Sequence, residues 1–171
     1  MMAGMTERTQ TPPAATAATV PGDLGWHLGM VLRGYQTRFE AAVAEMPAGI
    51  RGFQVLSAVV HKDPPNQQAL GAHLAIDRTV LTYLLDTLVD AGVVERILDP
   101  ADRRARKIIA TSTGQQMLAA FELRVAAAEA DLLDGMEENE ARTLGALISR
   151  LARNVHRTHP GTNPCEAMDK L

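Results

Sequence analysis

Residues 66–114 read NQQALGAHLAIDRTVLTYLLDTLVDAGVVERILDPADRRARKIIATSTG. Asn66 is a favourable N-cap residue, and it opens a short helix whose Leu70 and Leu74 are spaced to face inward. A tight connection leads to Asp77, which we expect to cap a second helix. That helix should bury five apolar side chains, namely Val80, Leu81, Leu84, Leu85 and Leu88. The segment therefore begins as two helices joined by a short turn.

A β-hairpin is expected directly after this pair of helices. Gly92 suits the left-handed conformation that ends a helix. Two β-prone runs, 93–98 and 107–111, flank a charged loop that contains Asp99 and Pro100. Helix, turn, helix and hairpin in this order are the layout of a winged helix-turn-helix. In that layout the second helix enters the major groove of DNA, and the hairpin reaches toward the neighbouring backbone or minor groove.

Further helices are predicted on both sides of this segment. Residues 24–46 have apolar side chains at spacings of three and four, and a second helix spans about 51–61, before Pro64. Two long helices, at about 112–134 and 137–156, follow the hairpin. The apolar residues of the four helices are Leu24, Leu28, Val31, Leu32, Tyr35, Phe39, Val43 and Met46; Phe53, Leu56, Val59 and Val60; Leu118, Phe121, Val125 and Leu132; and Leu144, Leu147, Ile148, Leu151 and Val155.

The composition is that of one globular domain. A chain of 171 residues with 46% hydrophobic and 22% charged residues can bury a substantial core, and an aromatic content of 4% with abundant Ala and Leu favours helices. A single cysteine excludes an intramolecular disulfide, and the chain lacks an apolar run long enough for a membrane span. We therefore expect a cytoplasmic protein with flexible tails at 1–22 and 158–171.

Charge is distributed unevenly along the chain. The formal net charge is −3, yet five basic residues stand against Asp99 and Asp102 in the region of the hairpin. These are Arg96, Arg103, Arg104, Arg106 and Lys107. A locally positive segment on an acidic body can hold a polyanion, because salt screens the distant charges. Charge alone leaves a merely solvated surface about equally open.

The segment 66–114 resembles the core signature of the MarR family of bacterial transcriptional regulators, and the resemblance covers about residues 24–156. It is carried by Leu70, Leu74, Asp77-Arg78-Thr79, Leu84, Leu88, Gly92, Asp99-Pro100, Asp102-Arg103-Arg104, Thr111 and Gly114. It implies a mainly α fold, with about six helices and a two- or three-stranded β wing. Within a regulator domain at 23–157, the DNA-binding lobe would span 50–112, and dimerisation helices would span 23–46 and 113–157.

The resemblance implies DNA contacts on three elements. The candidates are Arg78, Thr79, Thr82 and Tyr83 on the recognition helix; Asn66, Gln67 and Gln68 on the preceding helix; and Arg103, Arg104, Arg106 and Lys107 in the wing. For Asn66, simple helix capping is an equal alternative. Asp102 would pair with either Arg103 or Arg104 and so stabilise the wing, while the other arginine enters the minor groove. A typical family member carries Arg at the position of Tyr83, which leaves the base specificity open.

Two partners besides DNA follow from the resemblance. A homodimer would place two recognition helices roughly 34 Å apart on a pseudo-palindromic operator. Its candidate interface residues, some of which can instead be core residues, are Leu28, Leu32, Leu144, Ile148, Leu151 and Val155. Many family members bind a small, often aromatic ligand, and the candidate residues here are Trp26, His27, Met30, Arg33, Tyr35 and His61. Ordinary packing or surface exposure is the alternative for each of these six.

The sequence thus predicts a DNA-binding transcriptional regulator, a repressor that a small aromatic effector releases from its operator. Ligand-independent DNA binding and a helical protein adapter are the alternatives, and an adapter has no need of the wing sequence DPADRRAR. The chain lacks a Gly-rich phosphate loop, a nucleophile elbow and a two-His metal motif, so an enzyme is not expected. His156, His159 and Cys165 match no standard zinc spacing, and we expect no metal, cofactor or membrane partner.

Overall fold

The computed structural model describes residues 22–98 and 106–159. Its elements are α1 (Asp23–Ala42), α2 (Gly49–Lys62), α3 (Gln67–Leu74), α4 (Arg78–Asp90), β1 (Val94–Leu98), β2 (Arg106–Ala110), α5 (Ser112–Leu132) and α6 (Glu138–Thr158). The two strands pair antiparallel, with Val94 opposite Ala110. The expected mainly α winged helix-turn-helix is therefore confirmed. None of the helices described is long and apolar enough to cross a membrane.

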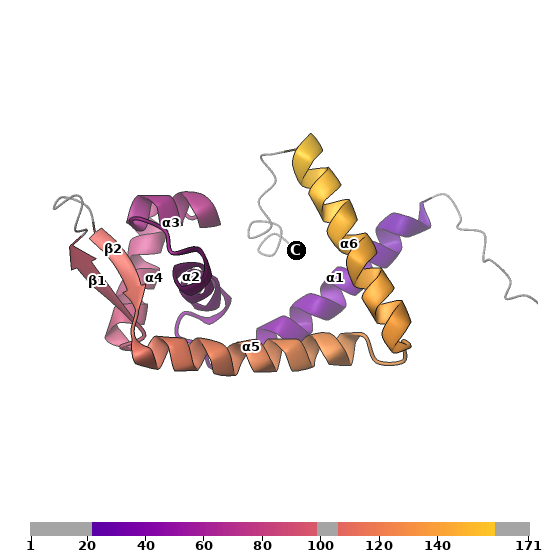
Figure 1. Ribbon diagram of the computed structural model, residues 1–171, viewed down its shortest axis with the longest axis horizontal. Helices are drawn as coiled ribbons and strands as arrows, with labels where there is room; N and C mark the ends of the chain where they lie inside the picture. Colours follow the sequence, from indigo (N-terminus) through magenta and orange to yellow (C-terminus); the bar gives the residue numbers. More distant parts are fainter. Residues whose placement is uncertain (1–21, 99–105, 160–171) are drawn as a thin grey trace, which may run out of the picture.

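The elements are arranged as a lobe and an arm (Figure 1). The lobe consists of α2, α3, α4 and the hairpin, and lies at one end of the molecule. Helix α5 leaves the base of the hairpin and runs to the other end, where α1 and α6 lie. Helix α1 packs along α5, and the Arg38 guanidinium is 2.6 Å from the Asp131 carboxylate across this contact. The wing and the terminal helices therefore lie at opposite ends of α5.

Three side-chain caps fix where the helices of the lobe begin. The Asn66 Oδ1 accepts from the Ala69 amide at 2.9 Å, and the Asp77 Oδ1 accepts from the Thr79 amide at 2.7 Å. The Thr79 and Val80 amides hold the pKa of Asp77 below its usual range, because they stabilise the charged carboxylate. Thr111 caps α5 in the same way. The caps predicted at Asn66 and Asp77 are confirmed.

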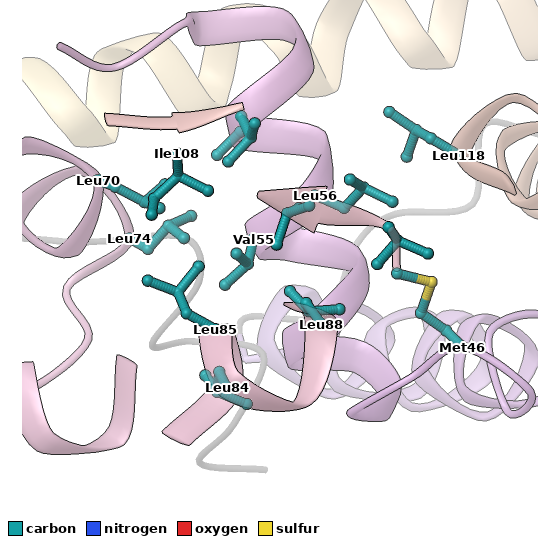
Figure 2. Packing of buried hydrophobic residues seen from close by; sticks show 14 of the residues in the cluster. Met46, Val55, Leu56, Leu70, Leu74, Leu84, Leu85, Leu88, Ile108 and Leu118 are labelled. Atoms are coloured by element: carbon teal, nitrogen blue, oxygen red, sulfur yellow. The ribbon is translucent and has the colours of Figure 1, made fainter. Parts of the chain in front are cut away.

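The hydrophobic core lies inside the lobe and at its junction with α5 (Figure 2). Leu56 of α2, Leu70 of α3, Leu85 of α4 and Ile108 of β2 are almost completely buried there. Each buried leucine of this kind contributes about 1.5–3 kcal/mol relative to an exposed one. The hairpin thus takes part in the core, and its packing fixes it against the helix pair.

Helix α4 corrects one prediction about this core. Val80 was expected to face inward, but its side chain is 50% exposed. Leu81, Leu84, Leu85 and Leu88 already form the complete buried stripe of a 3.6-residue helix. Val80 lies beyond the edge of that stripe, on the outer surface of α4.

Helix α1 also differs from its prediction. It ends at Ala42 rather than Met46, because the chain tightens into turns in which the Met46 amide donates to the Val43 carbonyl. Val43 and Met46 remain buried, so the turn continues the apolar contact without the helix. The predicted apolar stripe of α1 is covered only toward its C-terminal end, and Leu28 is 47% exposed.

Candidate nucleic-acid interface

A groove of about 1190 Å³ lies between α3, α4 and the hairpin. Six of the eleven predicted DNA contacts line it, namely Asn66, Gln67, Gln68, Arg78, Thr82 and Arg106. Residues that lie 40 positions apart in the sequence are thus gathered around one hollow. Arg78 and Arg106 add positive charge to it from the N-terminus of α4 and from the start of β2.

Polar contacts inside the lobe hold α3 against α4. The Gln67 amide nitrogen donates to the Thr82 hydroxyl at 3.2 Å, and that hydroxyl donates to the Arg78 carbonyl at 2.8 Å. The Asn66 side-chain oxygen is used by its cap, which confirms the capping alternative for this residue. Its side-chain amide nitrogen is the group that can still donate to a phosphate.

Arg96 is a residue of this site that the sequence reasoning missed. Its guanidinium lies 2.6 Å from the Asp86 carboxylate and 3.5 Å from the Thr82 carbonyl, so it joins β1 to α4 across the groove. The pair also neutralises a carboxylate that would otherwise repel phosphates. Nothing local reveals this contact, because it requires that the hairpin folds back onto α4. Arg96 was recognised only as one member of a basic cluster.

The two predicted basic residues of β2 have different surroundings. Arg106 is exposed and borders the groove. Successive side chains of a strand point to opposite faces, and the Lys107 ammonium lies 2.8 Å from the Asp63 carboxylate at the end of α2. Lys107 therefore has a contact within the lobe, and its predicted phosphate contact stays a prediction. The wing residues Asp102, Arg103 and Arg104 lie outside the residues described.

The remaining predicted contacts lie on the outer surface of α4. Tyr83 is 72% exposed, and Thr79 is exposed one turn before it. The 3.6-residue period places both on the side opposite the buried leucines, where they project away from the lobe. The lobe thus presents the exposed surface of α4 next to a groove that is lined in part by arginine side chains.

Comparison with known proteins agrees with this arrangement. The model of the MarR family matches residues 52–105, which include α3, α4 and β1. A structure of a cysteine-to-serine mutant of MarR from E. coli has 24% sequence identity and a TM-score of 0.68, over 79% of this chain and 98% of that one. The winged helix-turn-helix segment of this chain is thus similar to that of the MarR family over residues 52–105. The transcriptional regulator PcaV from Streptomyces coelicolor also has this fold, with 22% identity and a TM-score of 0.60, over 81% of this chain and 98% of that one.

A third similar structure contains a ligand. CouR from Rhodococcus jostii RHA1, bound to p-coumaroyl-CoA, is 26% identical to this chain with a TM-score of 0.58, over 77% of this chain and 92% of that one. The six ligand candidates of this chain do not form one cluster. Trp26 and Met30 are exposed near the start of α1, the end away from α2 (Figure 1).

The other four ligand candidates lie in three different surroundings. His27 and Arg33 are exposed on α1, whereas Tyr35 is half-buried and its ring centroid lies 5.7 Å from that of Phe39. Burial, with a smaller contribution from the negative charge of Glu129, raises the pKa of Tyr35. The His61 Nε2 lies 2.6 Å from a carboxylate oxygen of Glu122 on α5. His61 therefore belongs to the junction between α2 and α5, and not to the exposed end of α1.

The predicted interface residues lie on helices that the described chain leaves open. Helix α6 has no buried residue, and its apolar side chains remain open to solvent. Leu147, Ile148 and Leu151 are each exposed by 47–48%, and Val155 is exposed by 42%. Leu32 and Leu144 are partly buried. Within the described chain, core packing therefore does not account for the apolar side of α6.

Proposed function

We propose that this MarR-type chain is a sequence-specific DNA-binding transcriptional regulator that binds a pseudo-palindromic operator as a homodimer. The observation that carries this proposal is the groove beside α4, which Arg78 and Arg106 border and which the exposed surface of α4 adjoins. A phosphate strand needs cations at its edge, and the major groove admits a helix that projects beyond its lobe. Arg103 and Arg104 are proposed as further contacts from the sequence alone.

The N-terminal end of α3 supports a phosphate contact at the same groove. Gln67 and Gln68 are the first two residues of α3, where amides lack partners within the helix and favour an anion. Arg78 is the first residue of α4 and is exposed. The N-terminus of α3 and the Arg78 side chain therefore border one groove, which suits a polyanion better than a neutral partner.

A second copy of this chain is the proposed occupant of the open side of α6. The apolar residues Leu144, Ile148, Leu151 and Val155 recur at spacings of three and four, so they form one stripe along the helix. In α1, Leu28 and the 71% exposed Trp26 leave a similar surface open at the same end of the molecule. Pairing through these helices leaves both lobes free, as a two-fold operator requires.

We further infer that the regulator is a repressor, and that a small aromatic ligand releases it. The support is the similar structure of CouR, which contains p-coumaroyl-CoA, together with the side chains of Trp26, His27 and Arg33 on the open part of α1. Titration of the protein–operator complex with aromatic acids and their CoA thioesters tests this. Release of the DNA is expected, and retention across the whole panel would leave the ligand-independent regulator.

The decisive experiment is selection of binding sites by the full-length protein from a pool of random duplexes, followed by titration on the enriched site. A two-fold sequence motif is expected, and log Kd should depend on log salt with a slope of about 0.9 per phosphate neutralised. Arg106→Ala should weaken binding and reduce this slope. Arg142→Ala is the matched control, because it removes the same charge from an exposed pair on α6, 2.8 Å from Glu138. No enrichment, as the adapter alternative requires, would refute the proposal.

A further inference from the structure

We propose that the outer surface of α4 selects its operator through the 5-methyl groups of thymine rather than through a set of polar base contacts. This inference rests on the proposed DNA-binding function and specifies what that helix recognises. The surface in question consists of Thr79, Val80, Thr82, Tyr83 and Thr87. All five are at least partly exposed on the side of α4 away from its buried leucines.

The threonine hydroxyls on this surface are already engaged inside the protein. The Thr82 hydroxyl donates to the Arg78 carbonyl at 2.8 Å and accepts from the Gln67 amide at 3.2 Å. The Thr87 hydroxyl donates to the Tyr83 carbonyl at 3.1 Å, and the Thr79 side chain hydrogen-bonds the Asp77 cap. A threonine whose hydroxyl is bound in this way offers its Cγ2 methyl as the free part of its side chain.

The other residues of the surface continue this apolar character. Val80 is 50% exposed, so its methyl groups are accessible from solvent. Tyr83, 72% exposed, offers an aromatic ring with a single hydroxyl. Arg78 at the first position is the only Lys or Arg in α4. The Asp86 carboxylate is paired with Arg96. Apart from Arg78, α4 therefore lacks the side chains that read guanine or adenine with two hydrogen bonds.

Thymine is the base that fits this chemistry. Each base pair presents a distinct pattern in the major groove, and only thymine adds a methyl group, at C5. Methyl groups of Val80 and of the threonines can pack on it and remove apolar surface from water. One methyl group buried in this way is worth about a fourfold change in affinity.

The test uses the duplex selected with the full-length protein. If the selection enriches no sequence, the proposed function itself has failed, and this inference fails with it. If a site is enriched, all thymines of its central major-groove positions are replaced by deoxyuridine, which removes the methyl and keeps the hydrogen bonds. We expect about fourfold weaker binding for each contacted thymine, measured by fluorescence anisotropy. Equal affinity for the two duplexes, or an enriched site without thymine at these positions, would overturn the inference while DNA binding stands.

Two variants separate methyl contact from an effect of deoxyuridine on DNA shape. Val80→Thr keeps the side-chain shape and replaces a methyl by a hydroxyl, and Thr82→Ser removes one methyl while keeping its hydrogen bonds. Both should lower the ratio of thymine to deoxyuridine affinity. Thr37→Ser is the control, because Thr37 makes the same contact to the carbonyl four residues earlier, but on α1. A ratio that is the same in all three variants and the wild type would assign the preference to DNA shape and overturn the proposal.

Discussion

A methyl group added at Gly114 would collide with the backbone at the base of the wing. The Cβ of an alanine there would lie 1.9 Å from the Val93 carbonyl oxygen and 2.9 Å from its carbon. The Cβ would be fixed directly to the backbone of α5, and the atoms that it meets belong to the backbone of Val93. No side-chain rotation can therefore relieve the contact. We therefore expect Gly114→Ala to force α5 and β1 apart by more than 1 Å, since ordinary contacts begin near 3.4 Å.

The magnitude follows from the hydrogen bonds at this junction. The Thr111 amide donates to the Val93 carbonyl at 3.1 Å, and the Thr111 hydroxyl donates to the Gly92 carbonyl at 2.7 Å. The Gly114 amide in turn donates to the Thr111 hydroxyl at 3.0 Å. Separation of the two elements breaks the two bonds from Thr111 to Val93 and Gly92, each worth about 1 kcal/mol, whereas the Gly114–Thr111 bond lies within the cap of α5. Gly114→Ala should thus lower the free energy of unfolding by about 2 kcal/mol.

Urea denaturation at a fixed protein concentration measures this change, because association of subunits makes stability depend on concentration. Thr113→Ala is the matched control, since it places an alanine at an exposed position of the same first turn. It should alter the free energy of unfolding by less than about 0.5 kcal/mol. A Gly114→Ala protein as stable as this control would refute the argument from the Val93 contact.

Three further predictions concern other parts of the chain. Ala75 joins α3 to α4 with φ 52°, so Ala75→Gly should raise the urea midpoint by relieving roughly 1 kcal/mol of left-handed strain; a lower midpoint would contradict this. Leu151→Asp on α6 should shift the protein from dimer to monomer in sedimentation. Asn154→Asp, which introduces the same residue at an exposed polar position of that helix, should not. The folded-state pKa of Asp77 is lowered, so its cap stabilises the fold above the unfolded pKa, and this stabilisation is lost as the pH falls through the folded value. Asp77→Asn should therefore lose less stability than the wild type between about pH 7 and pH 3, as urea denaturation at each pH would measure.

Local signals in the sequence predicted the elements of the lobe well. Asn66, Asp77 and Thr111 cap helices through hydrogen bonds to amides two or three residues away, so the sequence of a few neighbours decides them. Gly92 has φ 69°, as its position after α4 requires. The resemblance to the MarR family came from the same stretch, and the match of the family model overlaps most of it.

Contacts between elements could not be predicted in this way. The pairs Arg96–Asp86 and Lys107–Asp63 depend on how the hairpin packs against α4 and α2, which no local pattern determines. Val80 was misplaced because an apolar residue at the edge of a helical stripe fits both the buried and the exposed side. Because Val80 is exposed on α4, its side chain is free to contact a base if this helix enters the major groove.

Helix α5 relates the two ends of the molecule mechanically. Its N-cap residue Thr111 is bound to the Gly92 and Val93 carbonyls at the base of the wing. Farther along α5, the Arg124 guanidinium lies 2.7 Å from Glu45, and Asp131 lies 2.6 Å from Arg38. A helix of 21 residues is about 30 Å long, so a tilt of about 10° at one end moves the other end by about 5 Å. Such a displacement is about 15% of the roughly 34 Å separation that two recognition helices need on adjacent turns of DNA, and it exceeds the length of a hydrogen bond, about 3 Å. In a homodimer paired through α1 and α6, any ligand that changes this pairing would therefore change the fit of both wings to the operator at once.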